Sequence, residues 1–292
     1  MLPCEVRSWL VSRNHLDATT LTQQSILMKK SVMPSASTTP SCGKSIAIAM
    51  ALVLAGGFSV SAFAQSKAPS VIDIEAGAAW QDRNDVQSPN DGTGTRFGLD
   101  RVTGSGPFFA PRLQFTTGIA PKHELRFVVA PLGIKGSGSF DQPVRFEGRN
   151  FAAGGVDAKY RFDSYRATWR YTFHDSAGWT WKVGATGKIR DAEITLTQGG
   201  TTTTRSNTGF VPLLHLYGER RLGKDARLTF EGDALASSRG RAFDLSARYV
   251  RDFNQQVSGF VGVRMLDGGT SGSTSYNFAR FNYLTVGLQY RL

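Results

Sequence analysis

Charged and hydroxyl side chains recur two places apart in several otherwise apolar segments of this chain. Residues 165–172, for example, read YRATWRYT. In a β-strand this spacing puts the charges on one face and the aromatic and aliphatic side chains on the other. Such a face can form ion pairs with neighbouring strands, or it can line a path for ions. The candidate lining residues of an enclosed lumen are Arg112, Arg126, Arg166, Arg170, Lys182, Lys188, Arg190, Glu219, Glu231, Asp233, Arg248 and Arg264.

The signs of these charges are unevenly distributed. Bases dominate the segments spanning residues 156–190, whereas acids concentrate at 73–75 and 219–244. Neighbouring strands lie about 4.8 Å apart, so pairs such as Glu219 with Arg227, or Asp233 with Arg248, are within reach if the register allows. Complete pairing predicts a closed, rigid interior. Unpaired Arg166, Arg170, Lys182, Lys188 or Arg190 would instead favour the passage of anions.

Catalysis needs a nucleophile, a base and an orienting group that converge on one point. His123 and His174 fall at predicted turns, and His215 lies alone in the middle of a segment. The Asn- and Asp-rich stretch 82–92 lacks the spacing and closing Glu of a calcium loop. Both cysteines, Cys4 and Cys42, precede the predicted mature chain, which excludes Cys-ligated metal and disulfides there. We therefore expect no catalytic site, no metal and no cofactor.

Alternation and turn residues divide the chain after residue 70 into ten strand-like segments. Ten is an even number, as a single-chain barrel with both ends on one side requires, and eight or twelve would follow from a miscounted loop. We expect a β-bulge near Asp163 and Ser164, where the alternation changes phase. The segments are 72–80, 109–119, 125–129, 156–173, 179–190, 210–221, 227–234, 243–249, 257–265 and 283–292.

The connections between these segments alternate in length. Four are short, at 120–123, 174–178, 223–226 and 254–256. The intervening ones are longer and rich in Gly, Asn, Asp, Ser and Thr, at 82–106, 139–155, 198–207 and 267–276, except for the short 237–241. Short turns on one side and long loops on the other are typical of transmembrane β-barrels.

The last segment carries the clearest resemblance to a known class. Leu284, Val286, Leu288, Tyr290 and Leu292 share one face. The segment resembles the terminal strand of bacterial outer-membrane β-barrels, which ends on a hydrophobic or aromatic residue that the barrel assembly machinery recognises; here Leu292 stands in place of the usual Phe. The resemblance implies an all-β, antiparallel transmembrane barrel in the outer membrane of a Gram-negative bacterium, with that machinery as a partner.

The N-terminal region predicts export. Lys44 precedes an apolar run at 45–58, and in Ala62-Phe63-Ala64 the two alanines supply small residues at the two positions a signal peptidase reads. The run has about 14 residues, fewer than the roughly 20 of a spanning helix. We expect residues 1–64 to be a leader, cleaved between Ala64 and Gln65, with Met28 as an alternative start. Residues 65–292 would then form one barrel domain.

Charge and size narrow the function. The first 64 residues hold five of the 34 Lys and Arg and two of the 23 Asp and Glu. Residues 65–292 therefore contain 29 basic and 21 acidic residues. The bases are spread along the segments of an exported chain, which argues against nucleic acid as a partner and favours outer-membrane lipid and lipopolysaccharide. Ten strands sit near the closed limit of barrel size. We expect a structural or surface-interaction barrel, with a small anion-preferring channel as the alternative, an outer-membrane enzyme as the second, and the oligomeric state open.

Overall fold

The computed structural model describes residues 68–292. The predicted leader, its cleavage point between Ala64 and Gln65, and the alternative start at Met28 lie outside the described residues. Within 68–292, no helix is long and apolar enough to span a membrane.

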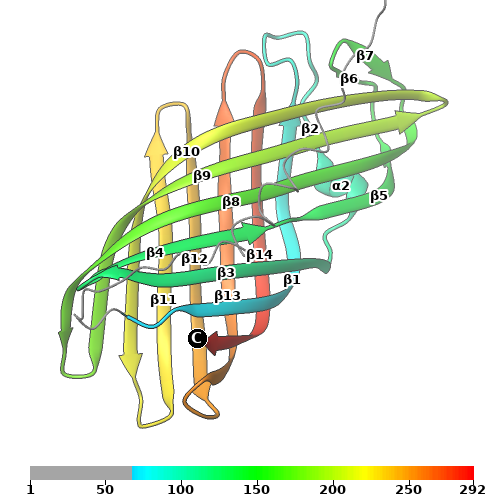
Figure 1. The fold of residues 1–292 in the computed structure, drawn as a ribbon. Helices are drawn as coiled ribbons and strands as arrows, with labels where there is room; N and C mark the ends of the chain where they lie inside the picture. The colour runs from blue at the N-terminus through cyan, green and yellow to red at the C-terminus, as the bar shows by residue number, and fades with distance from the viewer. Residues whose placement is uncertain (1–67) are drawn as a thin grey trace, which may run out of the picture. The chain divides into compact units, whose positions relative to one another are not determined.

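Ten antiparallel strands form a closed wall (Figure 1). Closure comes from pairing of the first and last strands, from Val71 opposite Arg291 to Gln87 opposite Tyr276. The predicted ten-stranded barrel is thereby confirmed. In the order of the wall the strands are β1 (Val71–Gln87), β3 (Phe108–Ala120), β4 (His123–Ala130) continued by β5 (Gly133–Phe140), β8 (Gly154–Ser176), β9 (Trp179–Gln198), β10 (Thr201–Arg221), β11 (Ala226–Ser237), β12 (Gly240–Asp252), β13 (Val257–Ser271) and β14 (Tyr276–Arg291).

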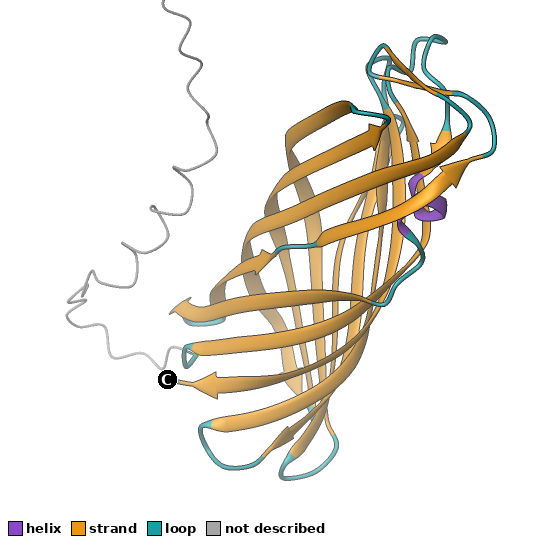
Figure 2. Ribbon diagram, turned by 90° about the vertical axis from the view of Figure 1, so that its right-hand side faces the viewer, coloured by secondary structure: helices purple, strands orange, loops and turns teal. Residues whose placement is uncertain are grey.

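Short turns join the strands at the end where the C-terminus lies, the periplasmic end of such barrels (Figure 2). At the opposite, outer end, two connections are long. One contains β2 (Phe97–Gly98) and the helix α2 (Leu99–Thr103), and the other contains the hairpin of β6 (Val144–Phe146) and β7 (Arg149–Phe151).

In the lower half of the barrel, apolar side chains point outward and charged ones inward. On β8, Trp169 is exposed, whereas Arg166, Thr168 and Arg170 are buried. The outward residues of β14, Leu284, Val286 and Leu288, are more than half exposed. In water this belt would be unfavourable, but in a bilayer it is solvated by lipid, and the closed wall pairs its backbone groups internally.

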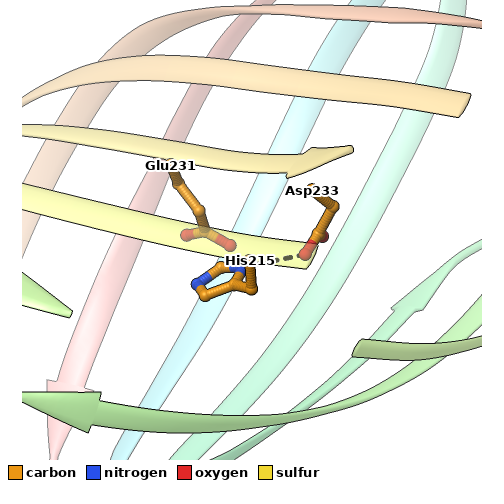
Figure 3. Close-up of side chains that lie close together, drawn as sticks. All are labelled: His215, Glu231 and Asp233. Atoms are coloured by element: carbon orange, nitrogen blue, oxygen red, sulfur yellow. Dashed lines mark hydrogen bonds and ion pairs between the residues drawn. The ribbon is translucent and has the colours of Figure 1, made fainter. Parts of the chain in front are cut away.

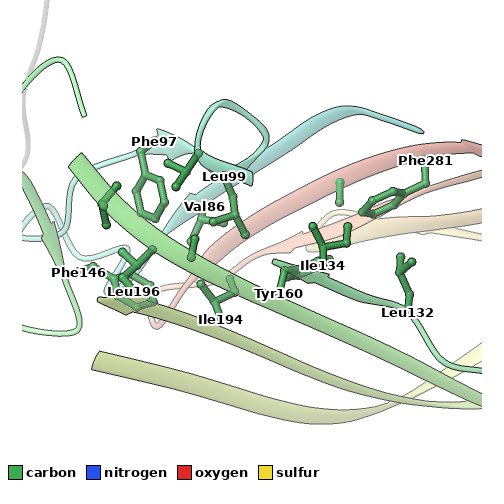
Figure 4. Close-up of a cluster of buried hydrophobic side chains, with 14 of the residues drawn as sticks. Val86, Phe97, Leu99, Leu132, Ile134, Phe146, Tyr160, Ile194, Leu196 and Phe281 are labelled. Carbon is green, nitrogen blue, oxygen red and sulfur yellow. The ribbon is translucent and has the colours of Figure 1, made fainter. Parts of the chain in front are cut away.

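The pattern inverts in the outer halves of β8 and β9. Beyond Ile189, the last exposed apolar residue of β9, the outward positions are Asp191, Glu193, Thr195 and Thr197. The inward positions Ile194 and Leu196 are buried in an apolar cluster with α2, β5 and β14 (Figure 4). Polar groups outside and an apolar core inside are what water requires. The inversion therefore marks where the strands leave the membrane.

This inversion corrects the predicted bulge at Asp163 and Ser164. The pairing of β8 with β9 runs without a shift from Asp157 to Thr172, and its irregularity lies between Thr172 and His174. The same face of β8 is buried throughout, with Tyr160 above and Arg166 below. At this point the inward side chains change from apolar to charged. In the sequence this change looks like a shift in the alternation, which is why a bulge was predicted.

The inversion also shortens the predicted outer loops. Residues 198–207 are not a loop, because β9 and β10 continue to a two-residue turn at Gly199 and Gly200. The predicted loop at 267–276 shrinks to the four residues between β13 and β14. Long outer loops are confirmed only for the two connections that contain α2 and the β6–β7 hairpin.

Candidate functional site

A layer of buried charges fills the middle of the lumen, and we call it the charged layer. Its side chains come from β1, β3, β4, β8, β10, β11, β12 and β13, and each points inward because the lipid-facing positions alternate with it along the strand. The layer consists of Asp73, Glu75, Arg112, Arg126, Arg166, Arg170, His215, Glu231, Asp233, Asp244, Arg248 and Arg264.

Ion pairs of the charged layer cross the lumen between strands that are not neighbours. Asp233 of β11 accepts from Arg126 of β4 at 3.2 Å and from Arg166 of β8 at 2.9 Å. On the other side, Arg248 of β12 reaches Glu75 of β1 at 2.5 Å. These bonds tie opposite walls of the barrel together across the lumen.

The remaining arginines of the layer also have acidic partners. Arg264 holds Asp244 through two hydrogen bonds of 2.7 Å. Arg170 lies 3.3 Å from Glu231, and Arg112 lies 4.0 Å from the same carboxylate. Each of the six arginines therefore has a carboxylate within 4.0 Å, which reduces the cost of burying its charge. The Nε and Nη1 atoms of Arg112 and Arg126 are buried without a hydrogen-bond partner among the described residues.

His215 is the one histidine brought into the layer (Figure 3). Its Nε2 accepts a hydrogen bond from Arg170 Nε at 3.0 Å. Because arginine can only donate, the proton of the neutral ring lies on Nδ1, which faces Asp233 at 2.7 Å. The hydroxyl of Thr186 donates a second hydrogen bond to the same oxygen, Asp233 Oδ1, at 2.7 Å. Both ring nitrogens are therefore engaged.

This arrangement leaves His215 poorly suited to acid–base chemistry. A base needs a nitrogen that a substrate can reach, whereas His215 is 3% exposed and doubly bonded. His215, Glu231 and Asp233 also lie close enough to hold a metal ion. Their carboxylates are, however, already engaged by Arg126, Arg166 and Arg170, whose positive charges oppose a cation at this position.

Of the two ion pairs expected from the sequence, the structure forms one. Arg227 Nε lies 3.7 Å from Glu219 Oε2, as expected. The expected pair of Asp233 and Arg248 is wrong, because Asp233 lies opposite Asp244 across β11 and β12, and Arg248 turns toward β1. Strand spacing predicted which neighbours can meet, but pairs across the lumen depend on its curvature.

The charged layer separates two cavities that share no lining residue. The periplasmic cavity has a volume of about 440 Å³ and contains the predicted residues Lys182 and Glu219. Two of its bases are paired, with Lys182 2.5 Å from Glu124 and Arg227 2.5 Å from Asp252. Three others, Arg221, Lys224 and Arg291, have no ion pair among residues 68–292.

The outer cavity has a volume of about 460 Å³. It contains the other two predicted residues, Lys188 and Arg190, together with the aromatic side chains of Tyr160, Phe162 and Phe281. Within the described part of the chain, Lys188 has neither an ion pair nor a hydrogen bond, and its Nζ lies 5.2 Å from the Phe162 ring centroid. Arg190 contacts Asn207, and no carboxylate among residues 68–292 lies within 4.0 Å of it.

A further charged cluster at the outer rim was not predicted. Asp267 lies 2.5 Å from Arg280, 3.1 Å from Arg241 and 3.4 Å from Arg83. The sequence placed Asp267 in a loop, so its contacts could not be anticipated. The continuation of β13 to Ser271 is what positions it.

One solved structure agrees with this fold, and two others show a weaker likeness to it. The Escherichia coli outer membrane protease OmpT aligns over 80% of this chain and 99% of its own, with a TM-score of 0.50 and 8% identity. Neisserial surface protein A aligns over 78% of this chain and 100% of its own, with a TM-score of 0.33 and 14% identity. A Pseudomonas aeruginosa FadL homologue aligns over 76% of this chain and 90% of its own, with a TM-score of 0.35 and 8% identity. No family model matches the sequence, and no curated protein matches it.

The fold and the lipid-facing belt together define the class. This is a bacterial outer-membrane β-barrel with ten strands, and it resides in the outer membrane of a Gram-negative cell. At 8% identity, the likeness to OmpT concerns the fold, so the chemistry of this chain must be argued from its own residues.

Proposed function

We propose that this protein is a barrel with a closed lumen that acts at its outer face rather than by conducting solutes. The observation that carries the proposal is the charged layer, in which each of six buried arginines has a carboxylate within 4.0 Å. A barrel near this size has room for side chains or one small ligand, whereas porin channels need about 16 strands.

The alternative of a small anion channel depends on free cations along the lumen. Three of the five candidate cations have carboxylate partners, since Arg166 pairs with Asp233, Arg170 with Glu231 and Lys182 with Glu124. The other two, Lys188 and Arg190, lie in the outer cavity above the charged layer. They support binding at the outer face more than passage through the barrel.

Single-channel recording tests the closed lumen. The protein purified from outer membranes, shown to be folded by its heat-modifiable migration, is expected to give no current steps in a planar bilayer at either polarity. Steps with anion preference would overturn the closed lumen and establish the channel.

A matched variant shows that the assay can detect an opening. Replacing both Glu75 and Arg248 with Ala removes both members of one ion pair, together with the 3.6 Å contact between Arg248 and Asp73. We expect small current steps from this double variant, because the truncation joins space on the two sides of the charged layer. Asp225→Asn, at an exposed periplasmic turn, should remain silent like the wild type.

A further inference from the structure

The wall of the barrel splits on the outer side of β10. Along β9, β10 is paired from Thr201 to Arg220, but along β11 it is paired only from Leu214 to Arg221. Residues 201–213 therefore have one edge without a strand partner. Pro212 stands where the pairing stops, and it has no N–H to donate to a neighbouring strand. Figure 1 shows β10 running away from the hairpin of β11 and β12 above this point.

The outer cavity lies at this split. On the β10 side its lining includes Gly209, Phe210 and Val211. On the side of the β11–β12 hairpin it includes Leu235, Ser237 and Arg239. Leu235 is on the inward face of β11 and is nevertheless 38% exposed, and Phe210, at the level where the lipid-facing belt ends, is 70% exposed. The cavity thus adjoins the outer edge of the membrane through the apolar side chains of Phe210 and Leu235.

The cavity combines an apolar lining with surplus positive charge. Five basic residues line it against two acids. Both acids are held by arginines, since Glu193 lies 3.5 Å from Arg161 and Asp267 is bound by its rim cluster. Lys188 is buried without an ion-pair partner among the described residues, and the buried Nε of Arg190 has no hydrogen-bond acceptor there. A buried cation without a partner is unfavourable, and an anion in the cavity would relieve this.

From these observations we infer that the outer cavity is a binding site for an anionic amphiphile, an acyl chain with a phosphate or carboxylate head, which enters sideways from the outer leaflet between β10 and β11. This inference rests on the proposed function at the outer face. The head binds Lys188 and Arg190, and the chain lies along Phe162, Val211 and Leu235 toward the split. Arg239, exposed at the turn between β11 and β12, meets anionic groups at the mouth. A volume of about 460 Å³ suits one such ligand.

Calorimetry on the purified protein in a neutral maltoside detergent tests the ligand class, with dodecyl phosphate, dodecanoate, dodecanol and inorganic phosphate as probes. We expect the two charged amphiphiles to bind and dodecanol to bind at least about tenfold more weakly, because a charged hydrogen bond is lost. Equal binding of dodecanol would overturn the role of the cations. Equal binding of inorganic phosphate would overturn the acyl chain. A preference between the phosphate and the carboxylate identifies the head.

Variants locate the site. Lys188→Gln and Arg190→Gln are each expected to weaken binding of dodecyl phosphate about tenfold. Lys159→Gln is the matched control, because Lys159 lies on the outward, exposed face of the neighbouring strand β8. Loss of binding in this control, or unchanged binding in both cavity variants, would overturn the assignment.

A tether across the split tests the route. Continuing the register of β10 and β11 places Val211 opposite Ser237, so Val211→Cys and Ser237→Cys can be joined by a short bis-maleimide. Joining them is expected to slow uptake of dodecyl phosphate from vesicles at least about tenfold relative to the unjoined double variant. Unchanged uptake would overturn lateral entry. None of these experiments measures conductance. A negative result for ligand binding or uptake is therefore distinguishable from a negative result for the closed lumen.

Discussion

At the residue scale, Asp233 is the most heavily bonded acid of the charged layer. Its carboxylate accepts hydrogen bonds from Arg126, Arg166, Thr186 and His215. Removing one partner from a buried ion network is costly, because it leaves the opposite charges without compensation. The network is therefore more sensitive to single changes than to the removal of whole pairs.

Asp233→Asn is accordingly expected to lower the free energy of unfolding by about 1–3 kcal/mol, because Arg126 and Arg166 each lose one counter-charge and keep a second, Glu231 and Asp244 respectively. Urea unfolding in lipid vesicles, followed by heat-modifiable migration, measures this change. Asp225→Asn, exposed at a periplasmic turn, is the control. A loss no larger than that of the control would contradict the role given to Asp233.

The residues of the charged layer show how far the sequence predicts a site. Alternation alone was enough to select Arg112, Arg126, Arg166 and their partners, because period two assigns each side chain to a face. Alternation gave no information on pairs across the lumen, and His215 appeared isolated although β8 and β11 supply its hydrogen-bond partners. Such contacts depend on the closure and tilt of the barrel, which no local pattern contains.

At the element scale, β8 and β9 each pass from lipid into water. Their lower halves face lipid outside and charges inside, and their outer halves face water outside and an apolar core inside. The number of strands and most periplasmic ends were predictable, because lipid imposes a strong alternation. The outer halves were not, because Thr-rich strands in water lack that pattern although Thr favours strands.

Ile194→Asn tests the inversion. Ile194 is buried in the apolar cluster, so an amide there should destabilise the outer half by about 2–4 kcal/mol. Limited proteolysis of intact cells or vesicles should then cut within the outer halves of β9 and β10 while the lipid-protected strands survive. Thr195→Asn, the adjacent outward position, should remain resistant. Equal cutting of the two variants would contradict the assigned faces.

At the scale of the whole molecule, the belt predicts depth in the bilayer. In single-tryptophan variants, with the other tryptophans replaced by Phe, Trp80 and Trp169 should be quenched by brominated lipid acyl chains, since both are exposed on the lipid-facing side. A tryptophan introduced by Thr195→Trp, above the belt, should not be quenched. Quenching of this third position, or none of the first two, would contradict the membrane boundary.

The tip of the β9–β10 hairpin is the feature farthest along these strands from the belt. Gly199 and Gly200 have φ angles of +54° and +82°, as a tight two-residue hairpin turn requires. The strands below it are paired without a break as far as the membrane, from Thr201 opposite Gln198 to Arg220 opposite Trp179. The tip therefore projects from the cell surface on a continuous hairpin. It is accessible there to an antibody or a phage, and it is a position where an epitope tag can be inserted away from the lipid.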